Sequence, residues 1–348
     1  MSAATARAAR YTGERKLEVV DVQPRLPGDG EVTIDVAFTG ICGTDLHIFH
    51  GAMDARVTMP AVLGHEMSGT IAAVGQNVDG WSVGDRVTVM PLGPCGSCPA
   101  CRSGNSHICH NLNFIGIDSP GSMQSSWTVP ESVLVAIPPA LALDHAALAE
   151  PTAVAVHDVR RANLQAGERA LIVGGGPIGL LVACVARSKG ADVVVCEVSP
   201  QRLELARSLG LKAIDPVAVS YQDFVADWTD GAGADATFEV SGSPDGVETA
   251  LQSLSVRGRM VLVAIHATPP PVNLQRVFWR ELTIIGARVY ERVDFEEAVS
   301  LLAAGVIPAE ALISLIEPLD DASAAFAELE AGKAMKVLID CNLKGPDA

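Results

Sequence analysis

Residues 170–179 read Ala-Leu-Ile-Val-Gly-Gly-Gly-Pro-Ile-Gly, and this stretch decides how the second half of the chain folds. A short apolar run leads into three glycines, and Pro177 suits the first turn of a helix. The spacing Gly174-x-Gly176-x-x-Gly179 allows a tight turn, and the helix that follows presents free amide donors to a pyrophosphate. The stretch therefore predicts a strand, a phosphate-binding turn and a helix.

An acidic residue follows at the distance that a dinucleotide site requires. Glu197 comes directly after the next apolar run, Asp192–Cys196, and a carboxylate there can bind both ribose hydroxyls. It also repels a 2′-phosphate and so favours NAD over NADP, although Arg202 could accommodate that phosphate. The alternative is a glycine-rich turn in another α/β protein, with Glu197 solvated. We also assign five further residues to the cofactor site, namely Ile178, Val240, Ser241, Val263 and Ile265.

Outward from this stretch, strand-like and helical patterns alternate over residues 152–290, which predicts a parallel, doubly wound sheet. Residues 1–151 instead carry short strand-like runs separated by turn residues, including Arg10–Asp21, and are typical of an irregular β-barrel. Within residues 291–348, a strand over Val337–Cys341 is expected to return to the first domain. Since 348 residues exceed the usual size of one core, we predict a two-domain α/β protein.

Four of the eight cysteines lie close together in the first domain: Cys95, Cys98, Cys101 and Cys109. Their spacing is typical of metal ligands, and four thiolates around zinc form a structural site without an open position. An iron–sulfur cluster is the first alternative, but its last cysteine usually follows sooner. Disulfides are the second, but nothing marks the chain as secreted. We expect a zinc-held loop at about residues 93–110.

The composition argues against several classes of partner. A formal charge of −16 disfavours nucleic acid and anionic membranes, because an acidic surface repels both. Hydrophobic residues make up 49% and charged residues 19%, which suits a folded enzyme rather than a disordered chain. The first thirteen residues lack the apolar core of a signal peptide. We therefore expect a cytoplasmic protein that acts on a small molecule.

A second group of ligand-type residues lies upstream, namely Cys42 in Gly-Ile-Cys-Gly-Thr-Asp-Leu-His and His65-Glu66 in Gly-His-Glu-Met-Ser-Gly. Taken singly, such a cysteine and histidine are more often buried core residues. Together with the four-cysteine loop, the turn at residues 84–87, Ala149-Glu150-Pro151 and the glycine motif, they resemble the zinc-containing medium-chain dehydrogenases. The resemblance covers nearly the whole chain. It implies a GroES-like catalytic domain, a Rossmann cofactor domain and a homo-oligomer, either a dimer or a tetramer.

The resemblance also implies a ligand set for a catalytic zinc. Cys42 and His65 match ligands of that metal. Glu150 stands where alcohol dehydrogenases proper place a second cysteine. A glutamate at this position resembles the sorbitol, threonine and butanediol dehydrogenases instead. Glu66 is either a direct ligand or a carboxylate that supports one. Two zinc ions per chain, one catalytic and one structural, and NAD are therefore expected.

Three residues that follow Cys42 in the sequence complete the set that the resemblance implies for catalysis. Thr44 matches the hydroxyl that contacts the substrate alcohol, Asp45 a carboxylate that orients a ligand, and His47 the histidine that relays the proton. The alternative for His47 is a solvated loop histidine. Three functions are open: a dehydrogenase of polyols or vicinal diols, a dehydrogenase of L-threonine or a sugar acid, and a non-catalytic zinc-binding protein. The intact ligand set favours catalysis. Met123–Trp127 departs from the polyol branch and bears on the size of the pocket.

Overall fold

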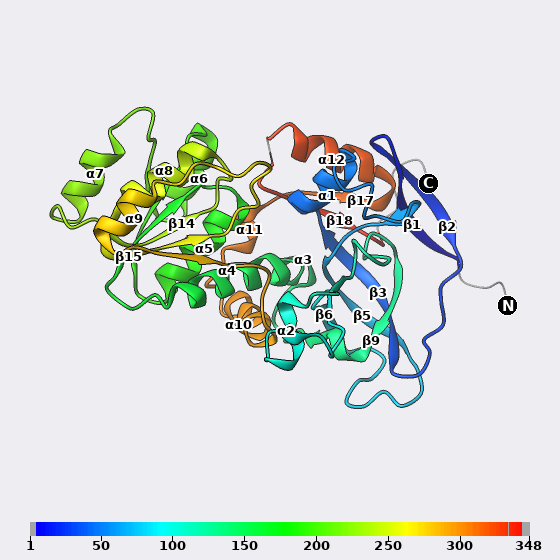
Figure 1. Cartoon of the computed structure of the whole chain (residues 1–348). Coiled ribbons are helices and arrows are strands. Elements are labelled where there is room, and N and C mark those ends of the chain that lie inside the picture. Colours follow the sequence, from blue (N-terminus) through cyan, green and yellow to red (C-terminus); the bar gives the residue numbers. More distant parts are fainter. Residues whose placement is uncertain (1–4, 333, 343–348) are drawn as a thin grey trace. The chain divides into compact units, whose positions relative to one another are not determined.

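The computed structural model describes residues 5–332 and 334–342, which form two compact units (Figure 1). The chain passes from the first unit to the second between Glu150 and Pro151, and it returns between Tyr290 and Glu291. Val306–Pro308 again group with the second unit. Among the described helices, none is both long enough and apolar enough to cross a membrane.

The second unit is built on a six-stranded parallel sheet in the order β13-β12-β11-β14-β15-β16. The chain runs outward from β11 to β13 and then restarts beside β11 with β14, so the carboxyl ends of β11 and β14 flank the crevice in which such sheets bind dinucleotides. This confirms the predicted doubly wound sheet. The strands are β11 (Arg169–Val173), β12 (Asp192–Cys196), β13 (Lys212–Ile214), β14 (Ala234–Glu239), β15 (Leu254–Leu262) and β16 (Thr283–Gly286).

Helices connect these strands (Figure 1), and α5 (Pro177–Ser188) and α8 (Pro244–Gln252) contribute buried residues to the core of the unit. The helix after the glycine motif, α5, is buried at every residue from Gly179 to Ala186, and it packs on β11 and β12. Burial on all sides explains why its sequence is apolar all round rather than in one stripe. The others are α4 (Ala149–Ala162), α6 (Pro200–Ser208), α7 (Tyr221–Trp228) and α9 (Leu274–Arg280).

The first unit contains two main β-sheets and a small hairpin, which supports the predicted GroES-like architecture. One sheet has the order β2-β1-β4, and the other has the order β10-β6-β5-β3-β18-β17 with β9 also paired to β3. The strands are β1 (Ala6–Gly13), β2 (Lys16–Val22), β3 (Glu31–Gly40), β4 (Ala61–Val62), β5 (Glu66–Val74), β6 (Arg86–Val89), β7 (Leu92–Gly93), β8 (Asn113–Phe114), β9 (Ser126–Pro130), β10 (Leu134–Ala136), β17 (Ile313–Pro318) and β18 (Lys336–Asp340).

The last two strands enter a sheet whose other members come from the first 136 residues. β18 pairs antiparallel with β3 and parallel with β17, so segments about 300 residues apart share one ladder. The helices of this unit are α1 (Gly43–Phe49), α2 (Pro99–Arg102), α3 (Leu143–Ala146), α10 (Arg292–Ala303), α11 (Ala309–Leu312) and α12 (Ala322–Glu330).

The prediction of one strand over Arg10–Asp21 is wrong, because this segment is a hairpin. β1 and β2 pair antiparallel across a turn at Glu14 and Arg15. Both turn residues lie in the left-handed region, with φ of +50° and +59°. Such φ values favour glycine or asparagine, so two charged residues at these positions conceal the turn in the sequence.

Candidate active site and metal centres

The structure brings together three of the predicted ligands of the catalytic metal. Cys42, His65 and Glu66 each offer a ligand atom, and these atoms all lie within 4.8 Å of one another. Cys42 caps α1, while His65 and Glu66 stand at the start of β5. Gly40 pairs with Glu66 across the β3–β5 ladder, and a Cβ there would come within 2.3 Å of Glu66 Oε2. Glycine at that position therefore makes room for the carboxylate.

Asp45 contacts two of these predicted ligands, Cys42 and His65. One of its carboxylate oxygens accepts a hydrogen bond from the Cys42 N–H at 2.8 Å, and the other lies 3.7 Å from His65 Nδ1. Asp45 and His65 are both buried. A carboxylate facing one nitrogen of a ligand histidine orients the ring and makes the other nitrogen a better metal donor. Asp45 thus lies where an orienting carboxylate is needed.

Sequence reasoning missed Lys336, the first residue of β18. Its ammonium group is buried and donates hydrogen bonds to Glu66 Oε2 and, at 3.1 Å, to the Ile41 carbonyl oxygen. Burial lowers the pKa of Lys336, but the carboxylate of Glu66 and other nearby acidic groups raise it above its usual value, so the lysine stays charged. A lysine at the start of an apolar strand is a weak signal, and its partner lies 270 residues away in the sequence.

Acidic donors outnumber basic groups around this cluster. Burial lowers the pKa of His65, but the Asp45 carboxylate, the Cys42 sulfur and Glu150 raise it well above its usual range. Glu150 is buried in the first turn of α4. It does not belong to the group whose ligand atoms lie within 4.8 Å of one another, but its charge acts on His65. A thiolate, an imidazole and carboxylates in a negative, buried site fit a zinc ion.

The two predicted proton-handling residues lie on α1. Thr44 and His47 are three residues apart and hence on one face of the helix. Thr44 is half-buried, and His47 is exposed. This order leads from the neighbourhood of Cys42 towards solvent.

The four-cysteine loop forms a separate cluster. The sulfur of Cys98 lies 3.5 Å from that of Cys101 and 3.7 Å from that of Cys109, which in turn lies 3.4 Å from Cys95 Sγ. Four sulfurs around one zinc are about 3.8 Å apart for a Zn–S bond of about 2.3 Å, whereas a disulfide would need about 2.0 Å. The distances therefore fit a metal site and exclude a disulfide between these pairs.

Backbone amides prepare this cluster for a metal. N–H groups of Ser97 and Cys98 donate to the Cys95 sulfur and lower the pKa of that thiol to about 5. By contrast, burial and neighbouring thiols raise the pKa of Cys101 to about 12. The four groups cannot all be thiolates without a cation, because like charges in contact oppose ionisation. The predicted loop contains α2, and the β7–β8 hairpin closes its base.

The glycine motif has the backbone geometry that was predicted for it. Gly174 has φ of +108°, and a Cβ there would lie 2.9 Å from the backbone nitrogen of Ser241. A Cβ at Gly179 would lie 1.9 Å from the Gly174 carbonyl oxygen. Gly176 caps α5, and Pro177 opens it. The amides at the start of α5 are thus available to a phosphate group.

Glu197 lies beside this turn and accepts hydrogen bonds through both carboxylate oxygens. Oε2 accepts from Gly175 N–H at 2.7 Å, and Oε1 accepts from Val198 and Ser199 N–H at 2.7 and 2.8 Å. Arg202 approaches Oε2 to 3.8 Å. The carboxylate therefore orders the turn as well as presenting a negative charge to it.

The other predicted cofactor residues surround the same end of the sheet. Ile178 lies in the first turn of α5 and is half-buried. Val240 and Ser241 follow β14, and the N–H of Val240 donates to the Val173 carbonyl oxygen at 2.9 Å. The remaining two, Val263 and Ile265, follow β15.

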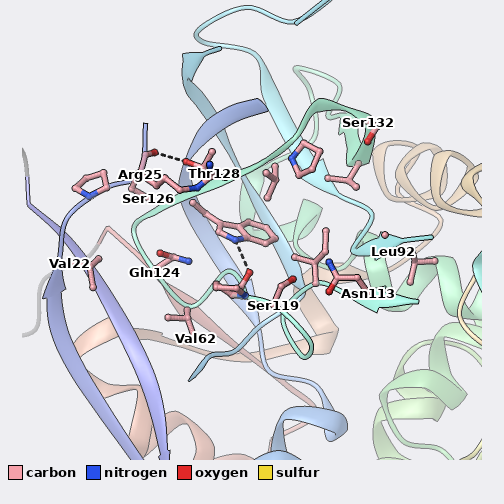
Figure 2. Close-up of a pocket in the computed structure, with 18 of the residues that line it drawn as sticks. Val22, Arg25, Val62, Leu92, Asn113, Ser119, Gln124, Ser126, Thr128 and Ser132 are labelled. Carbon is pink, nitrogen blue, oxygen red and sulfur yellow. Dashed lines mark hydrogen bonds between the residues drawn. The ribbon is translucent and has the colours of Figure 1, made fainter. Parts of the chain in front are cut away.

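A cavity of about 670 Å³ in the first unit contains none of the predicted metal ligands or catalytic residues. Figure 2 shows its wall, in which the Thr128 hydroxyl donates to the Arg25 carbonyl oxygen at 2.7 Å. Trp127 also lines it, with its indole N–H donating to the Pro120 carbonyl oxygen. Of the departing stretch Met123–Trp127, the residues Gln124, Ser126 and Trp127 line this cavity, whereas Met123 packs against Gly64, the residue before His65.

Comparisons with known proteins agree with this geometry. Residues 28–139 match the family model of the alcohol dehydrogenase GroES-like domain, and residues 177–304 match that of zinc-binding dehydrogenases. A 2-dehydro-3-deoxy-L-galactonate 5-dehydrogenase from Pseudoalteromonas atlantica is 48% identical over 96% of this chain and 98% of its own length. A sorbitol dehydrogenase from Halalkalibacterium halodurans is 33% identical over 90% of this chain and 92% of its own.

A solved structure shows the same likeness in three dimensions. A proposed zinc-binding dehydrogenase from Sinorhizobium meliloti 1021, solved with NADP bound, superposes with a TM-score of 0.90. It is 30% identical, and the match covers 97% of this chain and 99% of that one. The chain therefore belongs to the zinc-containing medium-chain dehydrogenases, and it is a zinc-dependent dehydrogenase that uses a nicotinamide dinucleotide.

Proposed function

We propose that this enzyme transfers a hydride between NAD and a secondary alcohol on a polyhydroxylated chain, such as a sugar alcohol or a vicinal diol. The observation that carries the proposal is the group of half-buried Cys42 with buried His65 and Glu66, on which Glu150 acts in place of a second cysteine. Within the family, a glutamate at this position is typical of the branch that acts on polyols and diols. The sorbitol dehydrogenase similarity supports the same class.

We propose two zinc ions per chain, one held by Cys42, His65 and one or both of Glu66 and Glu150, the other by the four-cysteine loop. A zinc ion held by these residues with an open position would supply Lewis-acid chemistry, which makes the proton of a bound alcohol more acidic. Asp45 orients His65, and Lys336 holds Glu66 by a buried ion pair. Residues 1–151 and 291–348 would form the catalytic domain, and residues 152–290 the cofactor domain.

Proton transfer is assigned to α1. The hydroxyl oxygen of Thr44 would accept the alcohol proton, and His47, one turn further along and exposed, would pass it to solvent. The hydride on the carbon that carries the hydroxyl group would then move to the nicotinamide, so that one proton and one hydride leave the alcohol to give a ketone.

NAD is proposed over NADP because the carboxylate of Glu197 is nearly buried beside the glycine turn and would repel a 2′-phosphate. Arg202 at 3.8 Å from that carboxylate is an opposing feature, since it could contact the same phosphate. A preference for NADP at equal concentrations would overturn the role given to Glu197.

A sugar acid is the second candidate substrate, because the relative at 48% identity is a sugar-acid dehydrogenase. The experiment that separates the two is a screen of NAD reduction, followed by absorbance, with polyols, vicinal diols, sugar acids and L-threonine. Highest kcat/KM on a neutral polyol or diol is the expected result. Turnover of sugar acids alone would replace the first candidate by the second, and no turnover of any alcohol would contradict both.

The oligomer is proposed to form through the edge of the parallel sheet. Among the described strands, β16 pairs with β15 alone, and α9 beside it has no buried residue. Phe278 and Trp279 on α9 are 73% and 72% exposed. A two-fold axis beside β16 would pair the strand with its own copy and cover the apolar side chains of α9, which is a self-complementary contact.

The free thiols of all eight cysteines support a reducing, cytoplasmic setting.

A further inference from the structure

Glu239 is a buried carboxylate that the proposed reaction does not use. It ends β14, and its side chain is fully shielded from solvent. Oε1 accepts three hydrogen bonds from the next turn: from Ser241 N–H at 2.9 Å, Ser241 Oγ at 2.6 Å and Gly242 N–H at 3.0 Å. One oxygen of Glu239 is therefore fully engaged in shaping the turn after β14.

The other oxygen faces a histidine from a different loop. Glu239 Oε2 lies 3.0 Å from Nε2 of His266, whose side chain is 13% exposed. Both atoms are shielded from solvent, and neither makes a hydrogen bond of good geometry to any described residue, so each is the nearest polar group available to the other. Two buried polar atoms at this distance need a proton between them, because an unpaired carboxylate oxygen against an unprotonated nitrogen would be repulsive. A close polar contact therefore joins the loop after β15 to the turn after β14.

These two segments lie against the glycine motif. A Cβ at Gly174 would come within 3.1 Å of the Val240 carbonyl carbon and 2.9 Å of Ser241 N, so the turn after β14 packs directly on the phosphate-binding turn. The backbone carbonyl of Glu239 also accepts from Val263 and Ala264 N–H at 3.0 and 3.1 Å. Glu239 thus holds both segments, through its backbone on one side and its side chain on the other.

Sheet topology says which half of a dinucleotide these segments face. The motif and Glu197 follow β11 and β12, the strands of the first mononucleotide-binding half. Glu239 ends β14 and His266 follows β15, the strands of the second half. Since the first half takes the adenosine side through its acidic residue, the second half takes the nicotinamide side.

We infer that Glu239 and His266 are a positioning pair, which holds the loops after β14 and β15 in the arrangement that receives the nicotinamide half of the cofactor. The inference rests on the proposed dinucleotide-binding function and deepens it. Neither residue is assigned a proton-transfer step. Without the pair, the loop that contains Val263 and Ile265 loses its side-chain attachment to the turn of Val240 and Ser241.

The test compares two ligands that share the adenosine half. His266→Leu, His266→Gln and wild-type enzyme are titrated with NADH and with ADP-ribose, which lacks the nicotinamide. For His266→Leu we expect about a tenfold rise in the Kd of NADH, the effect of losing one close polar contact, with the Kd of ADP-ribose changed less than about twofold. His266→Gln keeps an N–H donor and should recover part of the NADH affinity. The KM for NAD should rise with little change in kcat.

Thr268→Val, in the same loop and exposed, is the matched control and should bind both ligands as wild type does. NADH binding by His266→Leu equal to wild type would overturn the inference alone. An equal loss for NADH and ADP-ribose would also overturn it, because the pair would then support the whole unit rather than one half of the site. Wild-type enzyme that binds neither ligand would overturn the proposed function together with the inference.

Discussion

At the scale of single residues, the candidate catalytic centre is a balance between buried acids and two cations. Asp45, Glu66 and Glu150 act on His65 or Lys336 across the site. Lys336 donates to one oxygen of the Glu66 carboxylate and so offsets part of the negative charge of the site. The centre therefore keeps an excess of negative donors, which is the condition for holding a divalent cation.

Cys42→Ala should abolish turnover, to below about 1% of wild type, because it removes a thiolate ligand that no neighbouring group replaces. Metal analysis should fall from two zinc ions per chain to one, while NADH titration should give an unchanged Kd. Cys341→Ala, a buried cysteine outside both clusters, should keep two zinc ions and activity. Full activity in Cys42→Ala would refute the ligand assignment.

Lys336→Met should lower the free energy of unfolding by about 3–5 kcal/mol, because it leaves the Glu66 carboxylate buried without its partner. Urea unfolding of the zinc-depleted protein measures this change without a contribution from metal binding. Adding Glu66→Gln to Lys336→Met should restore more than half of the loss. Lys16→Met removes an exposed lysine and should change stability by less than about 0.5 kcal/mol. Equal changes in the free energy of unfolding for the two lysine variants would show that the buried ion pair stabilises the protein no more than an exposed one.

At the scale of elements, the sequence predicted best where a local rule sets the structure. The strand-like runs Asp192–Cys196 and Lys212–Ile214 each predict a strand, and β12 and β13 have these ends, because glycines and prolines bound them. The hairpin of β1 and β2 was missed because its turn uses Glu14 and Arg15 in a glycine-type conformation. The apolar run Met260–Ile265 predicts a strand there, but β15 spans Leu254–Leu262, with a register shift in its pairing with β14.

The same reasoning separates the site residues. The spacing of the four cysteines was sufficient to predict a metal site, whereas Cys42 and His65 were assigned because their local motifs resemble those of the dehydrogenase family. Lys336 and His266 act on partners that the fold brings close, and their neighbours in the sequence say nothing of Glu66 or Glu239. Long-range pairs of this kind are visible only when the strands are placed.

The four-cysteine loop is the element whose structure should depend most on a metal. Cys98→Ser should remove the structural zinc and expose residues 95–109 to proteolysis, since the loop has little apolar core of its own. One zinc per chain and binding of NADH should remain. Limited proteolysis with mass spectrometry locates the cut, and Cys184→Ser, a buried cysteine of α5, should behave as wild type. Cleavage elsewhere first would argue against a metal-held loop.

At the scale of the whole molecule, the surface at α9 and β16 is where self-association is expected. Phe278 and Trp279 are the largest of its exposed apolar side chains, and their rings contact each other at a centroid distance of 5.2 Å. Exposed aromatic pairs beside an unpaired strand edge usually mark a contact surface.

The double variant Phe278→Ser/Trp279→Ser should therefore shift the protein to a smaller oligomer, measured by light scattering coupled to size-exclusion chromatography. Val217→Ser, an equally exposed apolar residue at a distant turn of the same unit, should leave the molar mass unchanged. A wild-type monomer would contradict the proposed oligomer. A double variant with the wild-type mass would place the contact on another surface.

The pairing of β18 with β3 also has a consequence for how the molecule is made. A ribosome synthesises Cys42 and His65 early, yet Lys336, the partner of Glu66, follows 270 residues after it. At 5–20 residues per second, this interval is roughly 15–50 s. Throughout that time the nascent catalytic sheet lacks two strands, and its central carboxylate has no counter-charge. The parallel-sheet unit is complete before the sheet that carries the proposed metal ligands, so the proposed cofactor-binding unit is ready first and the candidate catalytic centre is finished last.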